Sequence, residues 1–233
     1  FTVLCLLAVP FIVPLVWMLS TSLKSLEQTL AFPPQWIPNP IQWGNYAELF
    51  RVAPFDRYLL NSALVTGLSV MGSVMSCSLA AYGFARLRFP GRDLIFLMLL
   101  ATLMLPAAVT TVPTFIVFQK LDWLNSFKPL IVPSFFGNAF YIFLLRQFFR
   151  TIPLDLEDAA RLDGASTLRI FLTIVLPLSK PALVTVAIFS FIASWNDFFY
   201  PLLYLNSEDK YTVAIGVANF QGSERVGPQM HLL

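Results

Sequence analysis

Apolar runs of about twenty residues, separated by short polar segments, most constrain what this chain can fold into. Of its 233 residues, 57% are hydrophobic and only 12% are charged, whereas a typical soluble domain is about 25% charged. The mean hydropathy is +0.72. Only helices or a closed barrel satisfy backbone hydrogen bonds inside a bilayer. Because the runs lack the alternation of barrel strands, we predict an all-α polytopic membrane protein.

The apolar runs predict one transmembrane domain over residues 1–233, with about five complete spans and the start of a sixth. The predicted spans cover residues 1–19, 59–85, 94–118, 130–149 and 182–205, and the sixth begins near residue 230. The third span is expected to bend near Pro106 and Pro113. Because the chain opens inside an apolar run and stops as the sixth span begins, we expect a fragment that lacks part of both outer helices. Residues 20–57 are expected to form short helices across the outer face, and residues 206–228 a polar interval.

The distribution of basic residues predicts the orientation of these spans. Loop 86–93 carries three arginines against a single aspartate, and the loop between the fourth and fifth spans is also rich in arginine. On the opposite side, each basic residue has an acidic residue nearby. Since cytoplasmic loops carry an excess of Lys and Arg, we expect loop 151–181 to be cytoplasmic. The net charge of +2 comes from scattered residues and gives no indication of nucleic acid binding.

Loop 151–181 contains an ordered pattern of acidic, alanine and glycine positions. Its members are Glu157, Asp158, Ala159, Ala160, Gly164, Ile174, Leu176 and Pro177. The acidic residues suit the first turn of a helix, and glycine readily adopts the positive φ of a turn. The pattern therefore predicts a short helix, a glycine turn and a second helix that enters the fifth span. An ordinary amphipathic connection between two spans is the plainer interpretation.

The fifth predicted span carries a polar patch, and charge at membrane depth usually has a function. Its members are Ser190, Ser194, Trp195, Asn196, Asp197 and Phe199. At helical spacing Ser190, Ser194 and Asp197 share one face, and Trp195 and Phe199 are four residues apart. We expect a pathway surface for a neutral, hydroxyl-rich solute, with an aromatic ledge and polar groups at its edge. A structural role is the alternative: Asp197 caps a broken helix or pairs with an arginine of another subunit, and Asn196 holds two helices together.

Catalytic and metal-binding patterns are not found in the sequence. Cys5 and Cys77 lie in apolar runs and are expected to pack as small hydrophobic residues. His231 is the only histidine, so it makes no site by itself. No Gly-x4-Gly-Lys-Ser/Thr loop is present, which indicates that this chain does not hydrolyse ATP by that route. We predict that the chain is not an enzyme.

The loop pattern resembles the signature loop of ABC-importer permeases. Asp158-Ala159-Ala160, then Gly164, then Ile174, Leu176 and Pro177 keep every spacing of that signature, with Asp158 in place of the usual glutamate and Glu157 beside it. Residues 195–202 also resemble the Trp-Asn-acidic-Phe-x-x-Pro-Leu segment of the carbohydrate-uptake branch, as in a maltose-type second permease. Asn61-Ser62, residues 81–86 and residues 146–149 agree with this branch, so the resemblance covers nearly the whole chain.

The resemblance implies the permease fold of six transmembrane helices and an ATP-driven importer for a carbohydrate or similar polyol-like solute. It further implies a homologous second permease, two ATPase subunits that bind ATP and Mg, and an extracytoplasmic solute-binding protein. In such a complex residues 157–164 would form the coupling helix that docks on an ATPase subunit. Which of Glu157 and Asp158 makes that contact stays open, as does whether Asp197 faces the pathway or the partner permease.

Two other functions compete with this hypothesis. A secondary transporter or channel would use Asp197 as a proton or cation site, although the spans lack the paired acidic residues typical of such relays. An ABC permease for glycerol phosphate or another charged solute would be expected to place unpaired basic residues inside its spans.

Overall fold

The computed structural model describes residues 2–222, in which helices are joined by turns and no strand occurs. The predicted all-α architecture is therefore confirmed. The chain divides into two units, one formed by residues 61–210 and the other by residues 2–60 together with residues 211–222. The assignment of all spans to one transmembrane domain stays a prediction.

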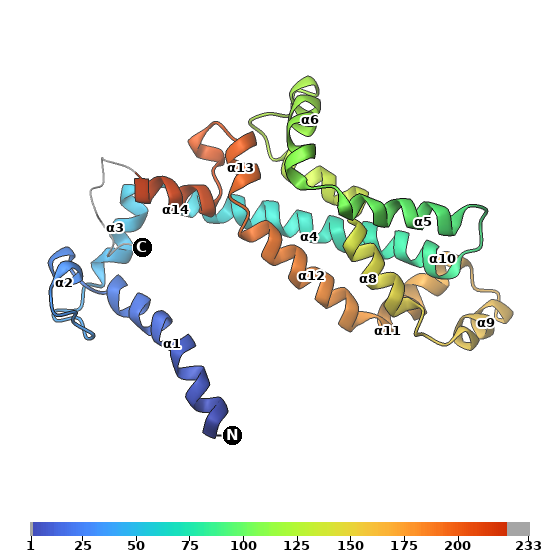
Figure 1. Cartoon of the computed structure of the whole chain (residues 1–233), viewed down its shortest axis with the longest axis horizontal. Helices are drawn as coiled ribbons and strands as arrows, with labels where there is room; N and C mark the ends of the chain where they lie inside the picture. The colour runs from blue at the N-terminus through green and yellow to red at the C-terminus, as the bar shows by residue number, and fades with distance from the viewer. Residues whose placement is uncertain (1, 223–233) are drawn as a thin grey trace. The chain divides into compact units, whose positions relative to one another are not determined.

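The larger unit holds most of the helices and is the part that positions the candidate sites (Figure 1). It contains most of α4 (Phe55–Arg86), then α5 (Arg92–Ala101), η1 (Thr102–Met104), α6 (Ala107–Lys120), α7 (Lys128–Ile131), η2 (Val132–Phe136), α8 (Ala139–Phe149), α9 (Leu154–Leu162), α10 (Thr167–Ile170), the π-helical turn η3 (Phe171–Val175), α11 (Leu176–Leu178), α12 (Lys180–Trp195), α13 (Phe199–Tyr204) and η4 (Glu208–Lys210).

Small residues along α4 let other backbone segments approach closely, as membrane helix interfaces require. A Cβ added to Gly72 would lie 2.7 Å from atoms of both Ser134 and Phe135. One turn further, the Ser76 hydroxyl donates to the Ser134 carbonyl at 2.9 Å. The Ser69 hydroxyl donates to the Leu130 carbonyl at 3.2 Å. These contacts show that the small residues of α4 serve packing inside the larger unit.

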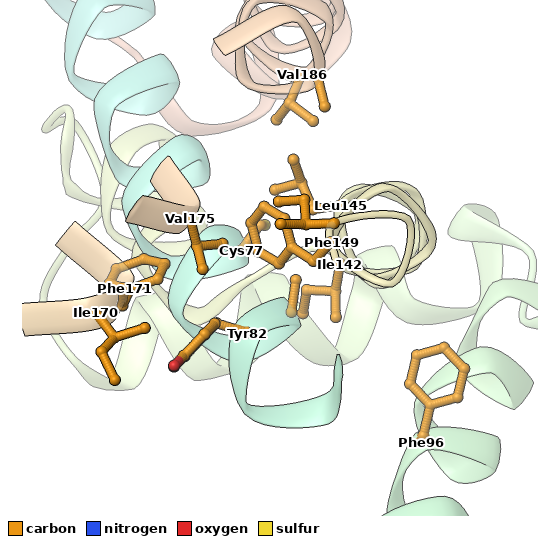
Figure 2. Close-up of a cluster of buried hydrophobic side chains, with 13 residues drawn as sticks. Cys77, Tyr82, Phe96, Ile142, Leu145, Phe149, Ile170, Phe171, Val175 and Val186 are labelled. Atoms are coloured by element: carbon orange, nitrogen blue, oxygen red, sulfur yellow. The ribbon is translucent and has the colours of Figure 1, made fainter. Parts of the chain in front are cut away.

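The apolar core of the larger unit lies where α4, α8, η3 and α12 meet (Figure 2). Its buried members include Cys77, Tyr82, Phe96, Ile142, Leu145, Phe149, Ile170, Phe171, Val175 and Val186. Figure 2 shows the α8 side chains Leu145 and Phe149 beside Cys77 of α4. The Cys77 sulfur accepts a hydrogen bond from the Asn138 amide at 3.2 Å, so this cysteine is packed as predicted. The side chain of Cys5 lies outside the described residues.

Two apolar helix pairs are sharply bent. The pair made of Arg92–Met104 and Ala107–Lys120 bends by 101°, and the break falls at Pro106. Pro113 lies within α6, which continues through it. The pair made of Thr167–Leu178 and Lys180–Trp195 bends by 79°, next to the buried Ser179. Phe55–Arg86 and Lys128–Phe149 are each long and apolar enough to cross a membrane unbroken.

The smaller unit consists of α1 (Thr2–Ser22), α2 (Leu26–Leu30), α3 (Gly44–Val52), the start of α4 and α14 (Val213–Gly222). Short helices between residues 20 and 57 were expected, and α2 and α3 confirm them. Residues 206–228 were predicted as a polar interval, and within them the structure forms the helix α14, which packs Phe220 against Phe55 and Tyr58 of α4. The predicted start of the sixth span and His231 lie outside the described residues.

Candidate functional site

The segment after α8 forms the predicted helix, glycine turn and second helix. Helix α9 begins after Pro153 and ends at Leu162. Gly164 has a φ of +80°, which few residues other than glycine adopt without strain. The Ala165 amide donates to the Ala160 carbonyl at 2.9 Å, and the Gly164 amide donates to the Arg161 carbonyl at 3.0 Å. These two bonds are the Schellman arrangement that ends a helix at a glycine.

The chain beyond the glycine leads back into the apolar core. The Ser166 hydroxyl caps α10 by accepting from the Arg169 amide at 3.3 Å. Ile174 and Leu176 are half-buried against the core cluster, whereas Pro177 is exposed early in α11. The π-helical turn lies within this stretch, and such turns often occur at functional positions. The apolar end of the motif therefore anchors the segment to the core.

Glu157 points inward from α9 and is fully buried. Its Oε1 lies 2.8 Å from Nε of Arg86 at the end of α4, and the side chains of Arg86 and Glu157 are 4% and 0% exposed. Arg86 Nη2 also donates to the carbonyls of Phe149 at 2.7 Å and Ile152 at 2.5 Å. The Tyr82 hydroxyl donates to Glu157 Oε2 at 3.4 Å. Breaking a buried ion pair by removing one partner typically costs about 3–5 kcal/mol.

Asp158 points outward from the same helix. Its side chain is 63% exposed and pairs with Arg161 Nη1 at 2.7 Å. Ala159 is exposed on the outer side, and Ala160 is half-buried on the inner side. Leu154, Leu156 and Leu162 are exposed, the last by 90%. Helix α9 thus has one face fixed to the core and one face with apolar and acidic groups available to a partner.

The buried environment of Glu157 could not be predicted from the sequence. In the sequence Arg86 is one of several basic residues predicted on the cytoplasmic side, and Tyr82 belongs to residues 81–86, which resemble the carbohydrate-uptake branch. No local pattern connects α4 to a residue in α9 that follows some seventy positions later. The i, i+4 spacing of Glu157 and Arg161 was a visible signal for that pair, whose atoms lie 3.4 Å apart.

The polar patch at residues 190–199 does not form one continuous helical face. Helix α12 ends at Trp195 and α13 begins at Phe199, so the i, i+7 spacing of Ser190 and Asp197 does not place them on one helix. Ser190 is buried and donates to the Ser73 hydroxyl at 3.3 Å. Ser194 donates to Thr66 at 3.2 Å. Both serines thereby share the face of α12 that contacts α4, whereas Asp197 lies beyond the end of this helix, so the prediction that all three share one face is wrong.

Asp197 lies in the break between α12 and α13. Its Oδ1 accepts from the Tyr200 amide at 3.2 Å, which is the contact of a helix cap. This contact agrees with the structural alternative of a capping role, with Asp197 one residue before the N-cap position, Phe198. A role of Asp197 in the pathway stays a prediction. Asn196 is exposed, and its Nδ2 donates to the Ile192 carbonyl at 2.9 Å.

The aromatic side chains of this patch pair differently from the prediction. Trp195 stacks on Phe191, with ring centroids 5.5 Å apart. Phe199 contacts Tyr200 edge-on at 5.4 Å and is exposed. A ledge made of Trp195 and Phe199 was expected from an unbroken helix, and the helix break removes the reason for it. Asn196 and Phe199 are the two predicted patch residues that remain exposed.

Comparisons with known proteins agree on one family. Residues 72–229 match the model of the binding-protein-dependent transport system inner membrane component. The diacetylchitobiose uptake system permease protein of Streptomyces coelicolor is 35% identical over 222 residues, which cover 95% of this chain and 73% of that protein. The sn-glycerol-3-phosphate transport system permease protein of Pectobacterium atrosepticum is 36% identical over 203 residues, which cover 84% and 72%.

A solved structure gives the same result. The crystal structure of a bacterial ABC transporter involved in the import of the acidic polysaccharide alginate matches with a TM-score of 0.83 and 26% identity, covering 94% of this chain and 77% of that one. The permease fold implied by the resemblance is confirmed, and the secondary transporter or channel is not supported. The chain belongs to the family of binding-protein-dependent transport system inner membrane components, the permease subunits of ABC importers, which are not themselves enzymes.

Proposed function

We propose that this permease moves a neutral carbohydrate or a similar polyol-like solute across the cytoplasmic membrane, and that separate ATPase subunits drive it by docking on α9. The observation that carries the proposal is the two-sided character of α9. One side is anchored to the core through Glu157, and the other presents exposed leucines beside Asp158.

The outer face of α9 has the composition of a docking surface. Apolar side chains that project from a short polar helix are unfavourable in water, and they mark sites where another protein binds. Leu162 and Leu154 provide such apolar groups, and Asp158 adds a charge that can select a basic partner. Because Glu157 is buried, Asp158 is the carboxylate that we assign to the contact with the ATPase subunit.

The cytoplasmic location of α9 is supported by the arginines around it. Arg88 precedes α5, Arg92 is its first residue, Arg150 follows α8, and Arg161 lies on α9 itself. Such clusters favour the cytoplasmic side. A cysteine placed at the exposed Leu162 is expected to react with a membrane-impermeant maleimide in inverted vesicles and to remain unlabelled in intact cells. Labelling in intact cells would overturn the orientation.

The cargo is inferred from the residues around the helix break. Asn196 and Phe199 are exposed there, and an amide beside an aromatic ring suits hydrogen bonding and stacking with a sugar. Residues 182–205 contain no Lys or Arg, and their only charged residue is Asp197. A negatively charged solute would find no countercharge in this segment. We therefore favour a neutral carbohydrate over an anion.

A glycerol phosphate cargo is the second candidate, because a glycerol phosphate permease is 36% identical to this chain. Uptake of labelled neutral disaccharides and of glycerol phosphate by membrane vesicles containing the complete importer separates the two. We expect disaccharide uptake that excess glycerol phosphate does not inhibit. Uptake of glycerol phosphate alone would replace the carbohydrate proposal.

The remaining parts of the complex are also proposals. A homologous second permease would complete the pathway, an extracytoplasmic binding protein would deliver the solute, and two ATPase subunits would bind ATP and Mg. This chain offers no energy source of its own, so the free energy for alternating access has to come from the differential binding of its partners to two conformations.

The docking role of α9 is tested at Gly164. The space around Gly164 is open, so a substitution there acts through the backbone and not through a clash. Gly164→Val forces a β-branched residue into a positive φ, at a cost of about 1–2 kcal/mol, whereas Asn tolerates that conformation. We expect Gly164→Val to abolish solute-stimulated ATPase activity of the reconstituted complex and Gly164→Asn to preserve most of it.

A matched control separates coupling from general backbone strain. Gly91 also has a positive φ, +77°, and open space around it, but it precedes α5. Gly91→Val is expected to leave stimulation intact. If Gly164→Val retained full stimulation, or if Gly91→Val lost as much, the docking role of α9 would be rejected.

A further inference from the structure

We infer that Arg86 is a positioning residue that ties α9 to the ends of α4 and α8, so that these three helices move as one body when α9 is displaced. The inference rests on the proposed docking of α9. It concerns what happens to the displacement inside this chain, after a partner has bound.

One guanidinium group joins the three helices. Arg86 is the last residue of α4, and its Nε lies 2.8 Å from Glu157 Oε1 on α9. Its Nη2 donates to the carbonyls of Phe149, in the last turn of α8, and of Ile152, just beyond it. A planar guanidinium presents five N–H donors in a fixed geometry. Lysine, with a single nitrogen, could not span these acceptors from the same position.

The acceptors suit a permanent positive charge. Carbonyls at the C-terminal end of a helix lack partners within the helix and carry partial negative charge. The guanidinium therefore satisfies the end of α8 while it neutralises the buried carboxylate of Glu157. Tyr82 lies one turn before Arg86 on α4 and donates to the other oxygen of Glu157. Glu157 is thus held by two side chains of α4.

Burial makes this connection rigid. Separating Arg86 from Glu157 would leave two charges in a site from which water is excluded, which is strongly unfavourable. The connection from α9 to α10, by contrast, passes through Gly164, which has a positive φ and open space where a Cβ would lie. A displacement of α9 will therefore move α4 and α8 with it and will bend the chain at Gly164. Through Arg86, the displacement of α9 is passed on to α4 and α8, which pack on the apolar core.

The test uses the complete importer with its ATPase subunits and binding protein. Glu157→Gln removes one charge with little change of shape, and Arg86→Gln removes the guanidinium with its charge. We expect solute-stimulated ATPase activity to fall about tenfold in each, within the range of typical coupling energies, while the ATPase subunits still co-purify. The double variant Arg86→Gln/Glu157→Gln is expected to lose no more than either single variant, because both act through one contact.

A second measurement reports the positions of the helices directly. Spin labels at Leu162 on α9 and Arg88 beyond α4 give a distance that we expect to stay the same when ATP binds. In Glu157→Gln we expect the distribution of distances between the two labels to broaden, or its mean to change when ATP binds. Asp155→Asn is the matched control, since Asp155 lies in the first turn of α9 and its side chain is exposed. It is expected to change neither readout.

The outcomes distinguish this inference from the docking proposal. If Glu157→Gln keeps both the stimulation and an unchanged label distance, Arg86 does not connect the helices, even if α9 docks. Additive losses in the double variant would also overturn the inference. If the ATPase subunits are shown not to bind α9 at all, Gly164→Val will leave stimulation intact, and the docking proposal fails first.

Discussion

Two segments of this permease carry acidic residues at positions that match family patterns, yet the structure treats them differently. In α9 the neighbouring carboxylates Glu157 and Asp158 point in opposite directions, one into the core and one outward. At the break between α12 and α13 the polar groups are largely satisfied within the chain: Ser190 and Ser194 bond to α4, and Asp197 caps α13. A similar set of residue types thus builds an exposed helix face in one place and a helix junction in the other.

The difference shows that residue type and spacing do not decide whether a polar group is available to a partner. What decides it is whether a neighbouring helix supplies a hydrogen-bond partner, because a buried polar group without one is costly. Within residues 2–222, Asp158 pairs with Arg161 of its own helix and remains mostly exposed. The comparison would fail if substitutions in α9 affected only stability, or if substitutions at the junction of α12 and α13 affected only transport.

The largest effect is expected from a charge reversal on the outer face of α9. Asp158→Arg places like charges against a basic partner surface and beside Arg161. Such contacts typically cost about 2 kcal/mol or more, or roughly 30-fold in affinity. We expect the ATPase subunits to be lost during purification and uptake to fall in proportion. Retention of the subunits on an affinity-tagged permease measures the effect.

Asp155→Arg serves as the control, because Asp155 is an exposed acid of the same helix. Asp155→Arg introduces the same change of net charge three positions away. Equal loss of ATPase subunits in the two variants would show that the general charge of the loop, and not the position of Asp158, determines binding.

The next effect is expected at Asp197, where removing a cap and removing a charge have different consequences. Asn can replace Asp as a helix cap, whereas Ala cannot, and loss of a cap typically costs about 1 kcal/mol. We therefore expect Asp197→Ala to lower the thermal unfolding midpoint of the purified complex and Asp197→Asn to leave midpoint and uptake close to those of the unmodified protein.

The same pair of variants tests the ion-site hypothesis. A proton or cation site needs the carboxylate itself, so Asn and Ala would both stop transport. Loss of uptake in Asp197→Asn at an unchanged unfolding midpoint would show that Asp197 acts in transport and not only as a cap.

The local structure of α9 could be predicted from the sequence because its causes are local. The helix begins after a proline, carries acidic residues in its first turn and ends at a glycine with positive φ. Each of these causes acts within a few residues. The all-α fold could likewise be predicted, since hydropathy and the lack of alternation exclude the alternatives. The permease family could be predicted because the spacing from Asp158 to Pro177 is long and specific.

The environment of the site could not be predicted, because it depends on contacts between helices far apart in the sequence. The ion pair of Arg86 and Glu157 joins α4 to α9, and the bond of Ser190 to Ser73 joins α12 to α4. The polar face expected at residues 190–197 assumed an unbroken helix through Asn196 and Asp197. A short polar residue that caps a helix and one that lines a pathway look the same in a sequence. Here the backbone break at residues 196–198 places Asp197 between two helices, a position that the residue pattern did not indicate.

A smaller effect is expected from the buried hydroxyl pair of Ser190 and Ser73. Ser190→Ala leaves the Ser73 hydroxyl without this bond, and a neutral hydrogen bond contributes about 1 kcal/mol. We expect a slightly lower unfolding midpoint and unchanged uptake. The double variant Ser73→Ala/Ser190→Ala should lose less than the sum of the single losses, since it removes donor and acceptor together. A strong loss of uptake in Ser190→Ala would support the predicted role of Ser190 in the solute pathway.

The smallest effect on stability is expected from substitution of Asn196, which is exposed at the junction of α12 and α13. This residue therefore best separates a structural role of the junction from a role in solute binding. Asn196 bonds only to the Ile192 carbonyl of its own helix, so Asn196→Ala should change the free energy of unfolding by less than about 0.5 kcal/mol. If the exposed amide meets the solute, the KM for uptake of a neutral sugar will rise roughly tenfold, since one neutral hydrogen bond is lost. An unchanged KM would mean that the whole junction of α12 and α13 serves the fold. The solute would then have to be recognised elsewhere in the complex, and α9 would be the one segment of the two that faces a partner.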